Sequence, residues 1–350
     1  MKLGVFVPNW IGDVAMSTPS LRALRGHVGT SDEIVGVVRP YVADVLAGTP
    51  WLDRQILYHP RSKTPAERTW AVLNKLRNER LDAIVLLTNS FRAAAMAWLS
   101  GAPQRIGYVR YGRGALLTHK LYHPRHALRW LPTPAIDTYL QLAYALGCEW
   151  ESPRLELSTL PADEEAADAV WKRWDLPPGE QVVVLNSGGA YGAAKLWPSE
   201  YFAQLARRIA TAQGLAVLVT CGPVERPIAE RIVELAAHPR VVSFADKPIS
   251  IGLSKACIRR SRLLVSTDSG PRFFGVAFNV PVISLFGPTH VGWTRTHYAR
   301  EICLQQNVPC GPCSRRACPL GHHDCMRSLS VERVYAAVLE QLGAERTIAD

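Results

Sequence analysis

The sequence predicts an α/β protein with two doubly wound, mostly parallel sheets in tandem. Short apolar segments alternate with amphipathic segments up to about residue 150, as expected for a parallel sheet with helices on both faces. A stretch containing Pro153, Pro161, Pro177 and Pro178 then interrupts the pattern. The alternation resumes near residue 181, which predicts a second unit of the same kind.

The chain length allows two domains that each bury their own core, because 350 residues exceed the usual size of one domain. We expect residues 1–158 to form a first Rossmann-like domain and residues 159–180 to connect the domains. Residues 181–329 then form a second Rossmann-like domain, and residues 330–350 form a C-terminal helix and tail.

The first domain begins with a short apolar strand at residues 3–8, a turn at residues 9–13 and a helix at residues 14–25. Two more strands are expected at residues 34–38 and 82–87, and two more helices at residues 64–80 and 91–99.

An acidic helix at residues 163–174 precedes the second domain. Its strands are expected at residues 181–185, 216–220, 263–266 and 281–286, and its helices at residues 199–212, 227–237, 250–260 and 330–342. Parallel sheets of this kind bind ligands at the carboxyl ends of their strands, so the residues that follow each strand are the candidate sites.

The composition is that of a globular protein, with 48% hydrophobic and 20% charged residues. The net charge of +10 favours an anionic partner, although a basic protein without one remains the alternative. We expect no nucleic-acid partner, because the basic residues form no long run and no nucleic-acid motif. No apolar run is long enough to span a bilayer and the first residues lack a signal peptide, so we expect a cytoplasmic protein.

The segment NWIGD, which ends at Asp13, follows the first strand on its ligand-binding edge. A carboxylate at this position is suited to accept a proton from a sugar hydroxyl. The alternative is a helix cap, because Asp is favoured at the N-cap. Asn89 and Ser90 follow another strand on the same edge and are candidates for acceptor contacts or, equally, for capping the next helix.

Two loops of the second domain are candidate phosphate sites. Ser187 and two glycines follow a strand, with Lys195 further along; small residues let backbone N–H groups approach phosphate, but the Walker A spacing is absent. The sequence Asp268-Ser269-Gly270-Pro271 links a strand to a helix start, which is either an anion site or a plain cap.

Four of the eight cysteines lie close together in the sequence, in the spacing C-x₂-C-x₄-C-x₆-C. This spacing suits a structural zinc that clamps a loop, while free thiols are the alternative in a reducing compartment. The candidate ligands are Cys310, Cys313, Cys318 and Cys325.

These segments together resemble the ADP-heptose:lipopolysaccharide heptosyltransferase family. The matching text is LGVFVPNWIGDVAMSTPSLRAL, LTNSFRAAAMAWLSGAPQRIGY, SGGAYGAAKLWPSEYFAQLA and TDSGPRFFGVAFNVPVISLFGPT, four segments in order over nearly the whole chain. The pattern is more similar to the second heptosyltransferase of the lipopolysaccharide pathway than to the first.

The resemblance implies the GT-B fold, in which an acceptor-binding domain and a nucleotide-sugar-binding domain face each other across a cleft. It implies inverting transfer of heptose from ADP-heptose to a heptose or 3-deoxy-octulosonic acid (Kdo) of the phosphorylated lipopolysaccharide core, at the membrane surface and with no cofactor required for chemistry. By this resemblance Asp13 is the catalytic base. The donor-binding residues are Gly12, Ser187, Lys195, Glu225, Asp268, Ser269 and Gly270.

One position departs from the family pattern. The family usually has a histidine three residues after the glycine of its Asp-Ser-Gly loop, and this chain has Phe273 there. Arg272 is a candidate for a replacement positive charge, and a transferase of the same fold with a different nucleotide sugar is the alternative function.

Two other classes of protein remain as alternatives. An oxidoreductase on a Rossmann fold requires G-x-G-x-x-G after its first strand, and NWIGDVAM lacks it. A non-enzymatic binding module built around the cysteine cluster would not bind an ADP-sugar.

Overall fold

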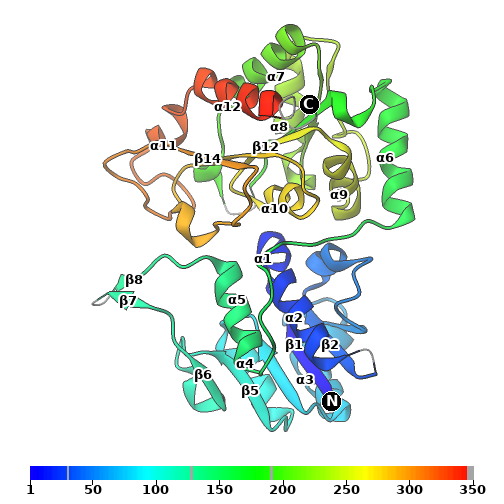
Figure 1. Ribbon diagram of the computed structural model, residues 1–350, viewed down its shortest axis with the longest axis vertical. Helices are drawn as coiled ribbons and strands as arrows, with labels where there is room; N and C mark the ends of the chain where they lie inside the picture. Colours follow the sequence, from blue (N-terminus) through cyan, green and yellow to red (C-terminus); the bar gives the residue numbers. More distant parts are fainter. Residues whose placement is uncertain (30, 127–128, 190–191, 345–350) are drawn as a thin grey trace. The chain divides into compact units, whose positions relative to one another are not determined.

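The computed structural model describes all residues except 30, 127–128, 190–191 and 345–350. The chain divides into two compact units (Figure 1). The first holds Met1–Ser158 and Gly292–His297, and the second holds Thr159–Val291 and the chain from Tyr298 onward. Each unit contains one six-stranded parallel sheet with helices on both faces, which confirms the predicted α/β class.

The first unit's sheet has the order β3-β2-β1-β4-β5-β6. Every neighbouring pair is parallel. This order reverses direction between β1 and β4, which makes that position the switch point of a doubly wound sheet. The strands are β1 (Lys2–Phe6), β2 (Glu33–Val38), β3 (Arg54–Leu57), β4 (Ala83–Leu86), β5 (Gln104–Tyr108) and β6 (His119–Leu121).

Helices cover both faces of this sheet. α1 and α2 pack with α5 on one face, and α3 and α4 pack together on the other. A separate antiparallel pair, β7 (Arg125–His126) and β8 (Arg129–Trp130), stands apart from the sheet (Figure 1). The helices are α1 (Ile11–Met16), α2 (Thr18–Val28), α3 (Thr69–Glu79), α4 (Phe91–Leu99) and α5 (Ala135–Tyr144).

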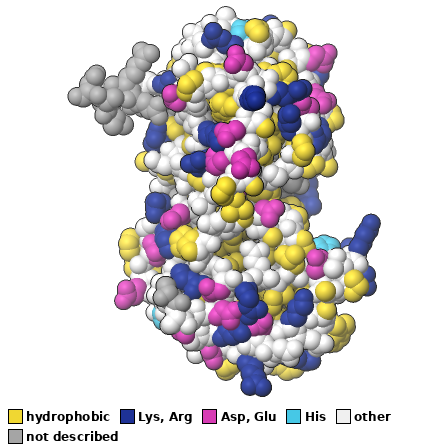
Figure 2. Space-filling view, turned by 90° about the vertical axis from the view of Figure 1, so that its right-hand side faces the viewer, with side chains coloured by type: hydrophobic (Ala, Val, Ile, Leu, Met, Phe, Trp, Pro, Cys, Tyr) yellow, Lys and Arg dark blue, Asp and Glu magenta, His cyan; other side chains and the backbone are white. Residues whose placement is uncertain are grey.

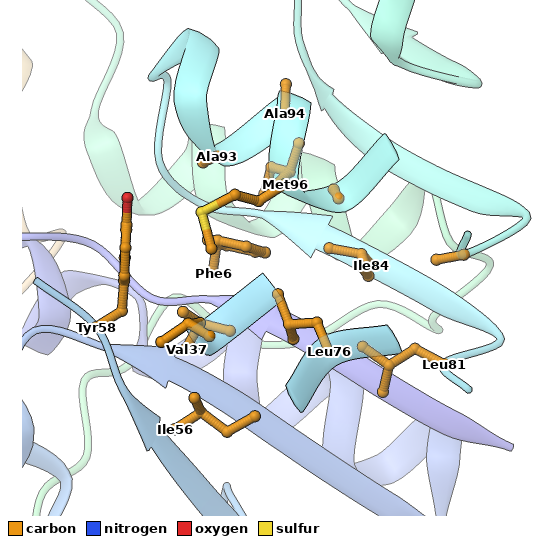
Figure 3. Close-up of a cluster of buried hydrophobic side chains, with 14 of the residues drawn as sticks. Phe6, Val37, Ile56, Tyr58, Leu76, Leu81, Ile84, Ala93, Ala94 and Met96 are labelled. Atoms are coloured by element: carbon orange, nitrogen blue, oxygen red, sulfur yellow. The ribbon is translucent and has the colours of Figure 1, made fainter. Parts of the chain in front are cut away.

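The core beneath α3 and α4 explains why these segments form helices. Apolar side chains recur at helical spacing and meet the sheet side chains Phe6, Val37 and Ile84 (Figure 3). Leu76 of α3 and Met96 of α4 are buried in this cluster. Burying one such side chain contributes about 1.5–3 kcal/mol relative to leaving it exposed, so the amphipathic pattern fixes which helix face meets the sheet.

The structure corrects the expected start of the first helix. Residues 9–13 were expected to form a turn, but α1 begins at Ile11 and places Asp13 in its first turn. The helix then breaks at Ser17, and α2 begins at Thr18 with a proline among its first residues. Proline lacks an N–H and therefore fits a helix start.

The second unit repeats the same topology. Its sheet has the order β11-β10-β9-β12-β13-β14, with the switch point between β9 and β12. The strands are β9 (Val182–Asn186), β10 (Ala216–Thr220), β11 (Val241–Ser243), β12 (Leu263–Thr267), β13 (Val282–Phe286) and β14 (Glu301–Gln305). Nearly all residues of the four central strands are fully buried, which accounts for their continuous apolar sequence.

Helices α7, α8 and α12 pack together, and α9 packs with both α6 and α10. The helices are α6 (Pro161–Trp174), α7 (Ser199–Gln213), α8 (Arg226–Ala236), α9 (Ile251–Arg260), α10 (Gly270–Ala277), α11 (Asp324–Arg327) and α12 (Val331–Ala344). The C-terminal helix expected after residue 330 is therefore present, and the tail expected after it lies outside the described residues.

The segment expected to connect the domains, residues 159–180, falls in the second unit. Its helix α6 buries Ala167 and Val170, and Glu164 forms ion pairs with Arg259 and Arg260 at the end of α9. An amphipathic helix must bury its apolar face, and α9 provides the surface. Conversely, residues 292–297 belong to the first unit, although they were expected in the second domain.

Within the described residues, no helix is both long and apolar enough to cross a bilayer. Basic and acidic side chains are interspersed on the face shown in Figure 2, so the net charge of +10 does not make that face uniformly basic.

Candidate functional site

The first candidate site lies at the carboxyl edge of the first unit's sheet. β1 and β4 are parallel neighbours, with Phe6 beside Leu86 at their ends. The segments that follow these strands, which contain Asp13 and Asn89, therefore leave the sheet at the same edge. This is the switch point at which doubly wound sheets bind ligands.

Asp13 does not cap a helix. Trp10 occupies the N-cap of α1, and Asp13 is the third helical residue, half-buried and next to the buried Gly12. The hydroxyl of Tyr139, from α5, donates a hydrogen bond to the Asp13 carboxylate. The positive end of the α1 dipole also favours negative charge at this position. The cap interpretation is therefore wrong, and the carboxylate is held as an oriented acceptor.

The environment of Asp13 keeps its donor protonated. Burial raises the pKa of Tyr139 well above its usual value, and the negative charge of Asp13 and the hydrogen bond to it raise it further. Tyr41, on the same edge, also has a raised pKa, caused by burial and then by Asp13. A tyrosine that does not ionise donates its proton at any assay pH, which fixes the direction of this hydrogen bond.

Asn89 and Ser90 both make contacts within the unit. The Asn89 Oδ1 accepts a hydrogen bond of 3.0 Å from Nη2 of Arg113. Arg113 is fully buried and also donates to the carbonyls of Thr88 and Tyr108. Ser90 caps α4 through a 3.1 Å hydrogen bond from the Ala93 N–H. The capping alternative therefore holds for Ser90, and acceptor contact by either residue stays a prediction.

The second candidate site lies at the equivalent edge of the second unit. β9 and β12 are parallel neighbours, and the segments that follow them bring Lys195 and Asp268 together. The Lys195 Nζ donates to the Asp268 Oδ2 at 2.6 Å and to the Asp268 carbonyl at 2.8 Å. Both side chains are buried, at 8% and 4% exposure. Two residues predicted separately from the sequence thus form one ion pair.

Asp268 is the centre of a larger buried network. Its Oδ1 accepts from Nη1 of Arg272 at 3.3 Å, and its Oδ2 accepts from Thr289 at 2.7 Å. Arg272 also donates from Nε to Glu301 at 2.5 Å. Burial alone would raise the pKa of Asp268, but Lys195 and Arg272 hold it below its usual value.

Arg272 does not replace the missing histidine as an exposed charge. It is fully buried, and its guanidinium is engaged by Asp268 and Glu301. Phe273 is also buried, at 3% exposure, with the Arg272 guanidinium 4.8 Å from its ring centroid. The expectation of a replacement charge was wrong because the charge of Arg272 balances two buried carboxylates.

Glu225 connects the loops that follow β9 and β10. Its Oε1 accepts from the Gly189 N–H at 2.8 Å, and its Oε2 accepts from the Gly222 N–H at 2.7 Å. A Cβ at Gly188 would lie 2.3 Å from the Glu225 carboxylate, so a larger residue there would displace this carboxylate. The donor-binding role that the resemblance implies for Glu225 stays a prediction.

The start of α10 supplies backbone N–H groups at this edge. Ser269 is the N-cap and Gly270 the first helical residue, while the Ser269 Oγ accepts from Asn186 at 2.9 Å instead of capping the helix. Ser187 is buried, and its hydroxyl has no hydrogen-bond partner within the described structure. Backbone N–H groups at a helix start and the unpaired Ser187 hydroxyl are donors suited to a phosphate group.

The four clustered cysteines form no disulfide bond. Cys310 is exposed, Cys325 is buried at α11, and the Cys310 Sγ lies 3.9 Å from Nε2 of His322. Across the described residues, no three or more His, Cys, Asp or Glu side chains are arranged to hold a metal ion. A structural zinc at Cys310, Cys313, Cys318 and Cys325 stays a prediction.

Sequence reasoning missed several residues that organise both sites. Tyr139, Arg113 and Glu301 carry no local motif, because each lies far along the chain from its partner. A buried arginine resembles a surface arginine in sequence, and only the fold reveals its partners.

The family model described as glycosyltransferase family 9 (heptosyltransferase) matches residues 69–323. Lipooligosaccharide heptosyltransferase 2 of Campylobacter jejuni is 22% identical over 342 residues, which cover 95% of this chain and 97% of that protein. Lipopolysaccharide heptosyltransferase 2 of Escherichia coli K12 is 24% identical over 359 residues, which cover 98% of each.

The solved structure of the E. coli ADP-heptose lps heptosyltransferase II is similar along the whole chain. Its TM-score is 0.78 at 20% identity, and the match covers 99% of this chain and 100% of that one. This likeness confirms the predicted GT-B fold, with its two Rossmann-like units. Because the family model matches well over half of the residues, the chain belongs to glycosyltransferase family 9, the heptosyltransferase family.

Proposed function

We propose that this protein transfers a heptose from ADP-heptose to a heptose or Kdo hydroxyl of the lipopolysaccharide inner core, with inversion at the anomeric carbon. Family membership and the names of the relatives support the sugar and the pathway. The observation that carries the proposal is the Asp13 carboxylate, half-buried at the switch point of the first sheet and oriented by Tyr139. This is the arrangement that a general base requires.

Asp13 accepts the proton of the acceptor hydroxyl as that oxygen forms its bond to the anomeric carbon. The bond between this carbon and the diphosphate oxygen breaks on the opposite side, and its electron pair leaves with ADP. Displacement from the opposite side inverts the configuration. Tyr139 holds the carboxylate in place, and its hydrogen bond favours the ionised form that accepts the proton.

The second unit stabilises the charge on the departing diphosphate. Lys195 supplies a cation, and the N–H groups at the start of α10 supply fixed dipoles. Asp268 holds Lys195 in place, and Arg272 compensates part of the Asp268 charge. Ser187, Ser269, Gly270 and Glu225 complete the donor site, and Gly12 allows the donor to approach Asp13.

In this mechanism no metal ion takes part in the chemical step. EDTA should therefore leave the turnover of the folded enzyme within about twofold, with circular dichroism as a control for the cysteine loop. If EDTA abolishes turnover while the fold is intact and added zinc restores it, the reaction requires a metal.

The enzyme works at the cytoplasmic face of the inner membrane without inserting into it. The net charge of +10 supports this placement, because anionic surfaces attract basic proteins. The acceptor is itself phosphorylated, so charge attraction brings protein and acceptor together.

The direct test is incubation with ADP-heptose and a panel of truncated core acceptors, with the products identified by mass spectrometry. We expect one added heptose on one acceptor of the panel and release of ADP. UDP- and GDP-sugars belong in the same panel, because Phe273 replaces the family histidine and a different donor is the second candidate. Transfer of another sugar, or no transfer to any core acceptor, would overturn the assignment.

A further inference from the structure

A small pocket in the first unit is lined by none of the residues assigned to the donor site and does not include Asp13. It has a volume of about 250 Å³ and is lined by Arg110, His123, Trp130 and Trp293. Arg110 follows β5 at the carboxyl edge of the sheet, and Trp130 belongs to the β7–β8 hairpin. Pockets for drug-sized ligands span about 300–1,000 Å³, so this pocket is of a size for a single sugar residue.

Arg110 of this pocket and Arg125 beside it contact the ring of Trp130 and not carboxylates. The Arg125 guanidinium lies 3.6 Å from the Trp130 ring centroid, and the Arg110 guanidinium lies 4.9 Å from it. Among the residues that the structure describes, neither guanidinium forms an ion pair with an acidic side chain. Their N–H donors are therefore available to an anion, and guanidinium groups bind carboxylates and phosphates through two parallel hydrogen bonds.

Burial and the positive charges of nearby arginines both affect the pKa of His123. Its ring stacks on Tyr108 at 3.9 Å and meets Trp130 edge-on. Burial, followed by the charges of Arg110, Arg113 and Arg125, lowers the pKa of His123 to about 4. The ring is therefore neutral near pH 7, and its buried Nε2 has no hydrogen-bond partner in the described part of the chain.

An acidic residue near this pocket, Asp137, is already paired. Asp137 lines the neighbouring pocket with Tyr108 and Thr138, and its Oδ1 lies 2.9 Å from Nε2 of His297. Asp137 and the Asp13 partner Tyr139 are two residues apart on α5. The same helix thus contributes to the edge that holds the base and to the wall beside the basic pocket.

We infer that this pocket binds an anionic sugar residue of the acceptor, with Arg110 and Arg125 on the carboxylate or phosphate, the Trp293 ring against the sugar and His123 Nε2 on a hydroxyl. The Trp293 side chain is 38% exposed, which leaves apolar surface for a sugar ring. This inference deepens the proposed function and rests on it, because it assigns the acceptor's charged group a place in the unit that holds the base.

The test is direct binding, followed by kinetics on the intact enzyme. Tryptophan fluorescence is titrated with Kdo for a carboxylate, glucose 6-phosphate for a phosphate, and glucose as the neutral control. We expect saturable binding of one of the two anions at least tenfold tighter than binding of glucose. Arg110→Gln should weaken that binding about tenfold or more, since a charge-assisted hydrogen bond is lost.

Arg154→Gln is the matched control, because Arg154 is an exposed arginine of the same unit that pairs with Glu156. In turnover, Arg110→Gln should raise the acceptor KM about tenfold with kcat nearly unchanged, and Arg154→Gln should change neither. Arg125→Gln provides a second, independent variant. Equal effects of Arg110→Gln and Arg154→Gln, or an equal loss with an acceptor that lacks the anionic group, would overturn the inference.

The two proposals fail in distinguishable ways. If no heptose is transferred but the anion binds in an Arg110-dependent manner, the proposed function fails and the pocket stands. If heptose is transferred and neither anion binds more tightly than glucose, the transferase stands and the pocket assignment fails.

Discussion

The two units have the same sheet order, but the charged side chains at their carboxyl edges differ in burial and in pairing. In the second unit, Lys195, Asp268, Arg272 and Glu301 are buried and paired with one another. In the first unit, Asp13 is half-buried beside a neutral tyrosine, and Arg110 and Arg125 face the Trp130 ring. The same fold therefore presents one edge with balanced charge and another with charged groups that ligands can reach.

This difference suits the two roles proposed for the units. A buried, balanced network holds the loops of the second unit rigidly, so that backbone N–H groups meet the donor without rearrangement. A general base must instead exchange protons and stay accessible to the acceptor. The comparison predicts that variants of the second unit affect both stability and donor use, whereas variants of the first unit affect turnover or acceptor binding.

The largest effect is expected from Asp13→Asn. Loss of the base should reduce kcat by about 100- to 10,000-fold, while isothermal titration should give an ADP affinity within threefold of the wild type. Unchanged ADP binding shows that the second unit is intact. Near-normal turnover would show that Asp13 is not the base. The proposed difference in role between the two units would then lose its support.

Lys195→Ala should lower kcat/KM for the donor by about 100-fold and also reduce the free energy of unfolding. Removing the cation leaves Asp268 with Arg272 and Thr289, so a loss of about 1–3 kcal/mol is expected. Donor kinetics and urea unfolding measure the two effects. A loss of activity without a loss of stability would mean that the ion pair contributes nothing to the fold.

Tyr139→Phe sharpens the comparison within the first unit. Without its hydrogen-bond donor the Asp13 carboxylate is less oriented and loses the contact that favours its ionised form. The kcat should therefore fall about tenfold, and the acidic limb of the pH profile should move to higher pH. Tyr41→Phe is the control on the same edge, with a smaller expected effect. An unchanged pH profile for Tyr139→Phe would show that the Tyr139 hydroxyl does not influence the protonation of Asp13.

The smallest effect is a pH dependence of stability from His123. Its pKa of about 4 lies below the ordinary value of 6.5, so the unfolded chain takes up the proton first. The contribution of neutral His123 to the free energy of unfolding is fully present above about pH 6.5 and is lost as the pH falls towards 4.

Urea unfolding at pH 7 and pH 5 measures this effect. The difference between the two pH values should be about 1 kcal/mol smaller in His123→Gln than in the wild type, after allowance for solvent screening. His119→Gln, an exposed control, should behave as the wild type does. Identical pH dependence in His123→Gln and the wild type would mean that burial and the nearby arginines do not lower the pKa of His123 in the folded protein.

The central strands and long helices were predictable from sequence. The apolar runs of β9, β10 and β12 and the amphipathic pattern of α4 and α7 each indicate one structure, because burial on both faces or on one face leaves a clear periodicity. The strands β3, β5, β6, β11 and β14 were missed, since runs of three to five residues carry little periodicity. The helical position of Asp13 was missed because Gly and Asp also favour turns.

The sequence by itself determined the α/β class, the duplication and the family, together with Asp13, Lys195 and Asp268 as candidates. These features follow from local patterns and from ordered motifs. Only the tertiary structure decided that Lys195 pairs with Asp268, that Arg272 is buried between two carboxylates, and that Tyr139 contacts Asp13. Apart from Arg272 and Asp268, which are four residues apart, these partners lie far apart along the chain. Their pairing follows from strand order and burial, which no local sequence pattern encodes.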